Sequence, residues 1–170
     1  MAIVLDGSNA NTVGIPNLGT AQASTSGTAI TFTGIPSGVK RIIVMFSGVS
    51  TSGSSNLLLQ IGSGSVVNTG YIGSTALVGS TTANSLMSTG FMLTPSQGSA
   101  TTTSGNISLF LQNSSTNQWV ENGNISSSDS ANTAISGGYK ALSGVLDRVV
   151  ITTVNGTDTF DAGSINIQYE

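Results

Sequence analysis

The segment RIIVMFSGV, residues Arg41–Val49, is nearly all apolar and decides the fold class. Runs of this kind are typical of a strand that lies at the centre of a sheet and is buried on both faces. The run follows the turn sequence GIPSG (Gly34–Gly38) and stops at the Ser/Gly-rich segment STSGSSN. We therefore predict a central strand bounded by turns.

Further short segments that are apolar or alternate in polarity recur along the chain. They cover residues 28–32, 57–62, 66–73, 86–93, 106–113, 117–126, 137–144, 147–154 and 164–170, of which 66–73 is the weakest. Ser, Thr, Asn and 22 Gly fill much of the remaining sequence and favour turns. Residues 74–87 come closest to a helix, but Gly and β-branched residues argue against one. The sequence predicts an all-β fold, an antiparallel, jelly-roll-like β-sandwich of about 8–10 short strands.

The two ends of the chain differ in character. Residues 1–23 are rich in turn-forming residues, and we predict an extended N-terminal arm there, followed by a sandwich domain over residues 24–170. The arm carries one short apolar stub, formed by Ile3, Val4 and Leu5. In the last strand Ile165, Ile167 and Tyr169 share one face, so we expect them in the core or at a subunit interface. Both sets are therefore predicted assembly residues.

The composition excludes several classes of function. Charged residues make up 6% of the chain, compared with about 25% in an average globular protein. Four cationic residues cannot form a nucleic-acid track, so we predict no nucleic-acid partner. The N-terminus lacks the pattern of a secretory signal, and no apolar stretch is long enough to span a bilayer, so we predict no membrane insertion.

The titratable residues offer little for catalysis. The chain has no His and no Cys, which removes histidine bases, histidine metal ligands and thiol chemistry. Asp158 and Asp161 lie three positions apart and fit either a calcium loop, an acid/base pair or a polar turn; the polar turn is favoured because charged oxygen ligands are few. The adjacent residues Asp147 and Arg148 could form a salt bridge, but a cross-strand charge pair at a sheet margin is favoured. We therefore predict that the protein is not an enzyme and needs no cofactor or metal.

Three aromatic residues are possible ligand-binding residues. Trp119 is the only Trp and could stack against a sugar ring, while Tyr71 and Tyr139 neighbour Gly-rich turns. Aromatic residues in a sandwich are more often core or interface anchors, and that role is favoured for all three.

The scarcity of charge also bears on the sheet edges. Soluble monomers commonly guard their edge strands with Lys, Pro or inward-pointing charges. This chain has four cationic residues and three Pro, so many edges are left for another chain to cover. We therefore expect the protein to self-associate.

Two stretches carry a family resemblance. The segments STSGTAITFTGIPSGVKRIIVMFSGVSTSGSSNLLLQIGSG (Ser24–Gly64) and LSGVLDRVVITTVNGTDTFDAGSINIQYE (Leu142–Glu170) resemble the carboxyl-terminal module of bacteriophage tail-fibre-like and minor structural proteins. The segment VLDGSNANTVGIPNLGTAQ is similar to the short lead-in of those proteins. The resemblance implies a structural protein of the virion surface, made in the host cytoplasm and commonly a homotrimer. It carries no catalytic motif.

Two functions stay open at this point. The first is an oligomeric virion module, either a fibre tip or a decoration of the head or tail, whose N-terminal arm attaches it to another virion protein. The second is a receptor-recognition module that binds a host surface glycan through Trp119, Tyr71 or Tyr139.

Overall fold

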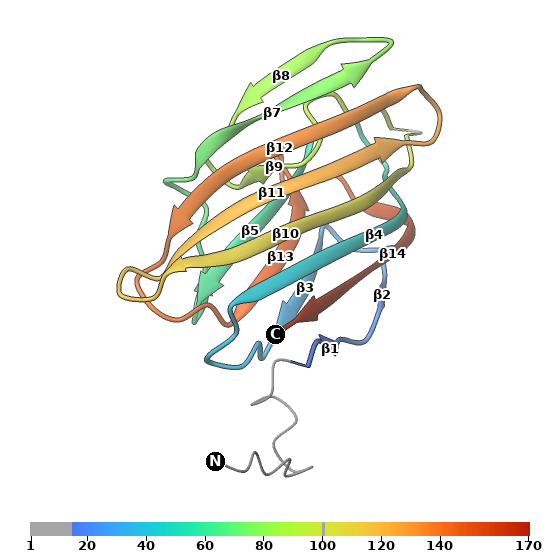
Figure 1. Ribbon diagram of the computed structural model, residues 1–170. Helices are drawn as coiled ribbons and strands as arrows, with labels where there is room; N and C mark the ends of the chain where they lie inside the picture. The colour runs from blue at the N-terminus through green and yellow to red at the C-terminus, as the bar shows by residue number, and fades with distance from the viewer. Residues whose placement is uncertain (1–14, 100) are drawn as a thin grey trace.

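A computed structural model describes residues 15–99 and 101–170, and this part of the chain consists of strands and loops without a helix (Figure 1). The strands are β1 (Asn17–Leu18), β2 (Gln22–Ala23), β3 (Ala29–Thr33), β4 (Arg41–Thr51), β5 (Leu57–Ser63), β6 (Ser65–Val66), β7 (Ile72–Gly79), β8 (Ala83–Leu86), β9 (Phe91–Met92), β10 (Thr103–Asn113), β11 (Gln118–Ser127), β12 (Asn132–Ala141), β13 (Arg148–Thr153) and β14 (Phe160–Tyr169).

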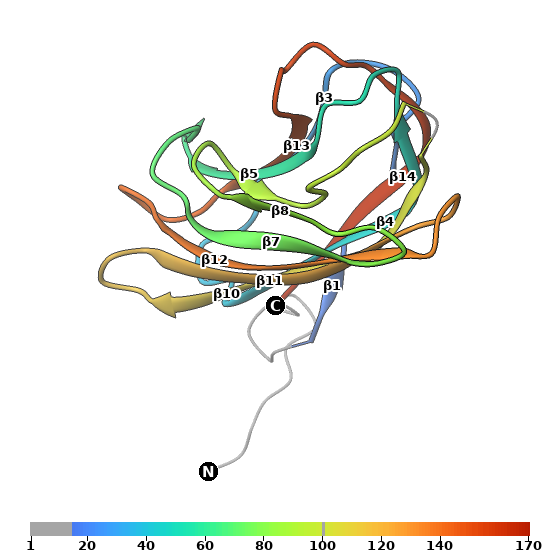
Figure 2. The same cartoon turned by 90° about the horizontal axis from the view of Figure 1, so that it is seen from above.

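These strands form two antiparallel sheets. The large sheet has nine strands in the order β1-β14-β4-β10-β11-β12-β7-β8, with β2 also paired to β14. The small sheet has five, in the order β3-β13-β5-β6, with β9 paired to β5. Figure 2 shows the two sheets stacked as layers, which confirms the predicted sandwich. The chain crosses between sheets eight times, from β2 to β3, β3 to β4, β4 to β5, β6 to β7, β8 to β9, β9 to β10, β12 to β13 and β13 to β14, which gives the jelly-roll-like arrangement.

Two of the predicted strands are wrong. Residues 66–73 contain only the end of β6 and the start of β7, because Gly70 has a φ of 70°, a left-handed conformation that interrupts a strand. Residues 86–93 are divided between β8 and β9 by the bends at Ser88–Gly90. The strand expected at 137–144 starts earlier, at Asn132. The helix was correctly excluded over residues 74–87, most of which form the β7–β8 hairpin.

Strand β4 is central, but it is buried on one face only. It lies between β14 and β10, as a central strand should. Ile42, Val44 and Phe46 are buried, whereas Ile43 and Met45 on the opposite face are half-buried. The expectation of burial on both faces is therefore wrong, because the small sheet covers only one side of the large sheet.

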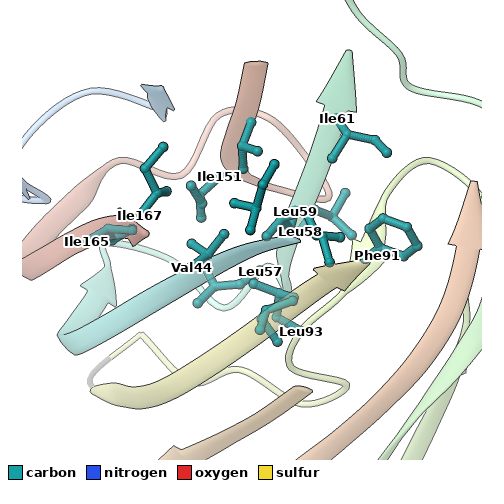
Figure 3. Packing of buried hydrophobic residues seen from close by; sticks show 14 of the residues in the cluster. Val44, Leu57, Leu58, Leu59, Ile61, Phe91, Leu93, Ile151, Ile165 and Ile167 are labelled. Carbon is teal, nitrogen blue, oxygen red and sulfur yellow. The ribbon is translucent and has the colours of Figure 1, made fainter. Parts of the chain in front are cut away.

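The core lies between the sheets. Figure 3 shows Val44 of β4 and Ile165 and Ile167 of β14 approaching side chains of β5, β9 and β13. Ile165 and Ile167 are buried, and Tyr169 is half-buried against the same cluster, so the predicted shared face of the last strand is confirmed. Burial of each large apolar side chain contributes about 1.5–3 kcal/mol to stability.

The first described residues pair with the last strand. The amide of Gly19 donates to the carbonyl of Ile167 at 2.8 Å, and the amide of Ser24 donates to the carbonyl of Gly163 at 3.0 Å. Strands β1 and β2 thus flank β14, and this part of the predicted arm belongs to the sheet edge. The predicted assembly residues Ile3, Val4 and Leu5 lie outside the described residues.

Candidate interaction surface

The outer side of five neighbouring strands in the large sheet carries no charged side chain. Cross-strand partners share a face of a sheet, so the strand register assigns each residue to the inner or the outer side. The outward residues form four rows, Phe110–Val120–Tyr139–Ile72, Ser108–Asn122–Gly137–Ser74–Leu86, Asn106–Asn124–Ile135–Ala76–Asn84 and Ser104–Ser126–Thr133–Val78. We call this surface, on β10, β11, β12, β7 and β8, the neutral face.

An apolar stripe crosses the neutral face. Phe110, Val120, Tyr139 and Ile72 are register partners on four successive strands and are 42%, 37%, 40% and 54% exposed. Leu86 on β8 is diagonal to Ile72 and is 80% exposed. The stripe, defined as these five residues, therefore runs to the edge of the large sheet, and its two most exposed members, Ile72 and Leu86, lie nearest that edge.

Apart from Ile135 and Val78, the rest of the neutral face is amide, hydroxyl and small side chains. Asn106, Asn122 and Asn124 offer donors and acceptors, with Ser108 beside them. Such groups can form hydrogen bonds with a partner without the large desolvation cost of a full charge. The surface therefore suits a neutral partner, whether protein or carbohydrate.

The residue missed by sequence reasoning is Glu121, a carboxylate that points into the sandwich. It is 1% exposed, and the Ser136 hydroxyl donates to its Oε1 at 2.6 Å. Its Oε2 is buried without a hydrogen-bond partner. Burial raises the pKa of Glu121 to about 7, although the hydrogen bond from Ser136 acts in the opposite direction. A group of this kind titrates near neutral pH and lowers stability when it ionises.

The neighbourhood of Glu121 explains its isolation. Its register partners are Leu109 on β10 and Gly138 on β12, neither of which has a polar side chain. Gly138 pairs in turn with Gly73, and Met87 packs over both glycines, because a Cβ built at either would lie 2.8 Å from the Met87 sulfur. Apart from the Ser136 hydroxyl on β12, apolar groups therefore surround the carboxylate on the strands beside it.

Two of the three aromatic candidates lie in the core. Trp119 and Tyr71 are each 2% exposed, so their rings cannot stack against a sugar, and the structure contradicts a ligand-binding role for both. The Tyr71 hydroxyl accepts from the amide of Ile61 at 2.8 Å and donates to the carbonyl of Val67 at 2.9 Å. Burial raises the pKa of Tyr71 to about 12, against the lowering effect of the Ile61 amide. Tyr71 thus ties the loop before β7 to β5.

Tyr139 differs from the other two. It belongs to the apolar stripe, between Val120 and Ile72, and 40% of its surface is exposed. Gly137, two residues away on the same strand and face, leaves space beside the ring. Of the three aromatic candidates, Tyr139 is the one that an external ligand can reach.

Asp158 and Asp161 do not form a joint site. The Asp158 carboxylate accepts from the amide of Ser55 at 2.9 Å and from the Asn155 side chain at 2.6 Å, and these bonds lower its pKa, that from Asn155 most. Asp161 instead accepts a hydrogen bond from the Ser50 hydroxyl. The favoured polar-turn interpretation fits these contacts, whereas the calcium loop and the acid/base pair do not.

Asp147 and Arg148 form an ion pair, but not across strands. Arg148 Nε lies 2.8 Å from Asp147 Oδ1, between sequence neighbours at the start of β13, so the predicted cross-strand geometry is wrong. The guanidinium holds the pKa of Asp147 below its usual value. Within residues 15–99 and 101–170, no three His, Cys, Asp or Glu side chains come together as metal ligands. The same residues include no helix long and apolar enough to cross a membrane.

A sequence signal for the neutral face exists. Residues 42–120 contain no Asp, Glu, Lys or Arg, and the first charged residue after them is the buried Glu121. This run supplies β10, β7, β8 and the beginning of β11. The fold adds the outward side of β12, which sequence alone does not place next to β7.

Comparison of the chain with protein families, with curated proteins and with solved structures finds no match.

Proposed function

We propose that the protein is a non-enzymatic structural component of a bacteriophage virion, an oligomeric surface module that attaches through its N-terminal arm. The observation that carries the proposal is the neutral face, with its uncharged rows and its exposed apolar stripe. Monomeric soluble proteins rarely expose large contiguous apolar patches, and such patches commonly mark interaction sites. The resemblance of residues 24–64 and 142–170 to phage tail-fibre-like and minor structural proteins supplies the class of assembly.

The chemistry of the surface also suits a particle. Contacts made by amide, hydroxyl and apolar groups do not depend on ion pairs that salt screens. A module exposed to variable ionic strength therefore keeps its contacts. The proposal includes contacts between copies, with a homotrimer as the state that the family resemblance implies, and a location on the virion surface after synthesis in the host cytoplasm.

Immunogold electron microscopy of purified phage particles tests this proposal. Antibodies raised against the folded protein should label one defined position on intact particles, at the tail, baseplate or head. Particles treated with the same antibodies after saturation with free protein are the control and should lose the label. Absence of specific label on particles that contain the chain by mass spectrometry would contradict a surface position, and absence of the chain itself would contradict the virion assignment.

A second candidate function is recognition of a host glycan on the neutral face. The specific observation is Tyr139, an exposed aromatic ring between Val120 and Ile72, with Gly137 and Asn122 in the adjacent row. An aromatic face and neutral amides are groups that bind the apolar faces and hydroxyls of sugars. A glycan array should give a saturable signal that Tyr139→Ala removes. Trp119→Ala is unsuited to this test because it would disturb the core, and no signal with the wild-type protein would reject the glycan function.

A further inference from the structure

Strand β8 leaves one edge of the large sheet open. Its only strand neighbour among the described residues is β7, and Figure 1 shows it as the outermost strand at that end. The amide of Met87 donates to the carbonyl of Gly73, which fixes the alternation of the β7–β8 hydrogen bonds. By that alternation, the backbone N–H and C=O groups of Asn84 and Leu86 point away from β7. The only hydrogen bond that described residues make to these groups is a long one, 3.5 Å, from the Ser85 hydroxyl to the Leu86 carbonyl.

Apart from its short length of four residues, this edge lacks the features that keep edges apart. Lys, Pro, inward charges or bulges usually prevent an edge strand from pairing with another chain. Strand β8 reads Ala-Asn-Ser-Leu and has none of these residues. Leu86 is 80% exposed, more than any other large hydrophobic residue in the described part of the chain. At the opposite end of the sheet, β14 is flanked by β1 and β2.

We propose that β8 pairs antiparallel with β8 of a second copy, around a two-fold axis that passes between the two Ser85 residues. In this register Asn84 of each copy faces Leu86 of the other. Both residues present outward backbone groups, so four hydrogen bonds form and the strand is its own complement, as a two-fold contact requires. The proposal extends the assembly function proposed above and names the surface that the copies use.

Charge and continuity favour a second copy over an unrelated strand. The contact brings no like charges together, because residues 42–120 of both copies are uncharged. The apolar stripe of each copy ends at Leu86, so pairing brings the two stripes to one seam and reduces the exposure of Leu86. The two large sheets then become one continuous sheet.

The size of the contact sets its strength. A pairing of two four-residue strands falls below the roughly 1,000 Å² that a stable interface buries. We therefore expect weak association of free protein and much stronger association where a particle holds many copies close together, because linkage raises the effective concentration. A two-fold contact closes at two copies, so a trimer would use a separate surface.

Cysteine cross-linking tests the pairing, because the chain has no Cys and each introduced thiol is unique. In the proposed register Ser85 faces Ser85 of the second copy with Cα atoms about 4.5 Å apart, which fits a disulfide. Full-length Ser85→Cys should form disulfide dimers about tenfold faster in oxidised glutathione than Ser114→Cys, an exposed residue of the β10–β11 turn. Non-reducing gels and mass spectrometry measure the rates.

A mixing experiment fixes the register. Asn84→Cys alone and Leu86→Cys alone should each dimerise slowly, whereas a mixture of the two should form the heterodimer. Adding Asn84→Lys to Ser85→Cys should reduce cross-linking to the rate of Ser114→Cys, because Lys guards an edge. The melting temperature should stay unchanged, since Asn84 is exposed and its backbone groups do not bond to β7.

Several results would overturn the pairing. Equal cross-linking rates for Ser85→Cys and Ser114→Cys would contradict it, and so would homodimers of Asn84→Cys that form faster than the heterodimer. A thiol in Ser85→Cys that is protected in particles but forms no disulfide would indicate that β8 pairs with a strand of another virion protein. Immunogold label on particles combined with a failed cross-link would reject the β8 contact alone. A successful cross-link without label would instead reject the virion function.

Discussion

The two halves of the large sheet share a backbone pattern but differ in what they place inside. The inward side chains of β14, β4 and β10 include Ile165, Ile167, Val44 and Leu109, all buried and apolar. Those of β11, β12 and β7 include Trp119, Ile125 and Leu77, but also Glu121, Ser136 and Thr75. The first half is closed at its edge by β1 and β2, and the second half ends at the open β8. Both halves bury a few hydroxyl side chains, Ser50, Thr51 and Thr103 in the first and Thr75 and Ser136 in the second. The first half therefore supplies most of the large apolar packing, while the second half is set apart by a buried carboxylate, Glu121, and by a surface for partners.

Removal of Ile165–Glu170 should have the largest effect, because it takes a strand from the well-packed half. The deletion removes two buried isoleucines, each worth about 2–5 kcal/mol by truncation, from a total stability of about 5–15 kcal/mol. It also removes the residues that pair with Asn17–Leu18 and with the first half of β4. We expect no soluble folded protein, as measured by yield and far-UV circular dichroism.

A pair of matched substitutions refines this prediction. Ile167→Ala should lower the free energy of unfolding by about 2–5 kcal/mol, whereas Leu86→Ala at the open edge should change it by less than about 0.5 kcal/mol. Urea denaturation measures both values. Similar losses in the two variants would mean that the halves do not differ in packing.

Glu121→Gln should have the next largest effect on the free energy of unfolding, and at high pH it should raise this free energy rather than lower it. The pKa of Glu121 rises from 4.5 to about 7 on folding, so the folded protein keeps a proton that the unfolded chain loses between these values. Stability should therefore fall as the pH rises from 4.5 through 7, by about 3 kcal/mol in total. Gln keeps an acceptor for the Ser136 hydroxyl and cannot ionise, so the variant should lack this loss.

The difference in pH-dependent stability between the wild type and Glu121→Gln isolates the contribution of Glu121. The pKa values of Asp147 and Asp158 are lowered on folding, so their contribution is lost as the pH falls, and it is common to wild type and variant. Urea denaturation at pH 4.5 and pH 8 should give equal stabilities at the lower pH and a more stable variant at the higher pH. Ser136→Ala should move the wild-type transition to higher pH, because it removes the hydrogen bond that lowers the pKa. Parallel curves for wild type and Glu121→Gln would contradict the burial of the carboxylate.

Tyr71→Phe should cost about 1–3 kcal/mol, because it leaves the buried Ile61 amide and the Val67 carbonyl without their partner. Tyr139→Phe is the matched control on the neutral face and should change stability by less than about 0.5 kcal/mol. Thermal unfolding of both variants checks the contrast. An equal effect of the two substitutions would contradict the assignment of Tyr71 to the core and Tyr139 to the surface.

The sequence predicts the first half of the large sheet better than the second. Alternation in Ile165–Tyr169 and the apolar run of Arg41–Val49 identify β14 and β4, because each segment is long and packs on the core with one face. The pattern fails over 66–73 and 86–93, where local turns interrupt short apolar runs. The roles of Trp119 and Tyr71 also could not be assigned, since residue type does not say which side of a strand or loop faces the core.

The candidate surface depends on strand order, which periodicity does not contain. Phe110, Val120, Tyr139 and Ile72 come from four separate segments, and only the order β10-β11-β12-β7 brings them into one row. The alternation of Trp119, Glu121 and Ile125 could have placed Glu121 on the inward side. Its ionisation near neutral pH, however, follows from the apolar neighbours that β10 and β12 supply.

The smallest effect on stability is expected for the ion pair between Arg41 and Glu170 in the first half of the sheet. Arg41 Nη2 lies 2.7 Å from Glu170 Oε1, and the two side chains are 39% and 26% exposed. A pair this open to solvent contributes about 0–1 kcal/mol, so Arg41→Ala should lower stability by about 0.5 kcal/mol. The position of Glu170 should survive, because its backbone amide donates to the Arg41 carbonyl and its carbonyl accepts from the amides of Lys40 and Arg41.

Urea denaturation at low and at high salt measures the contribution of this ion pair, which should disappear in about 1 M salt. A loss above about 2 kcal/mol that persists in salt would mean that the edge near β14 depends on this ion pair rather than on apolar packing, and would remove the main contrast between the two halves.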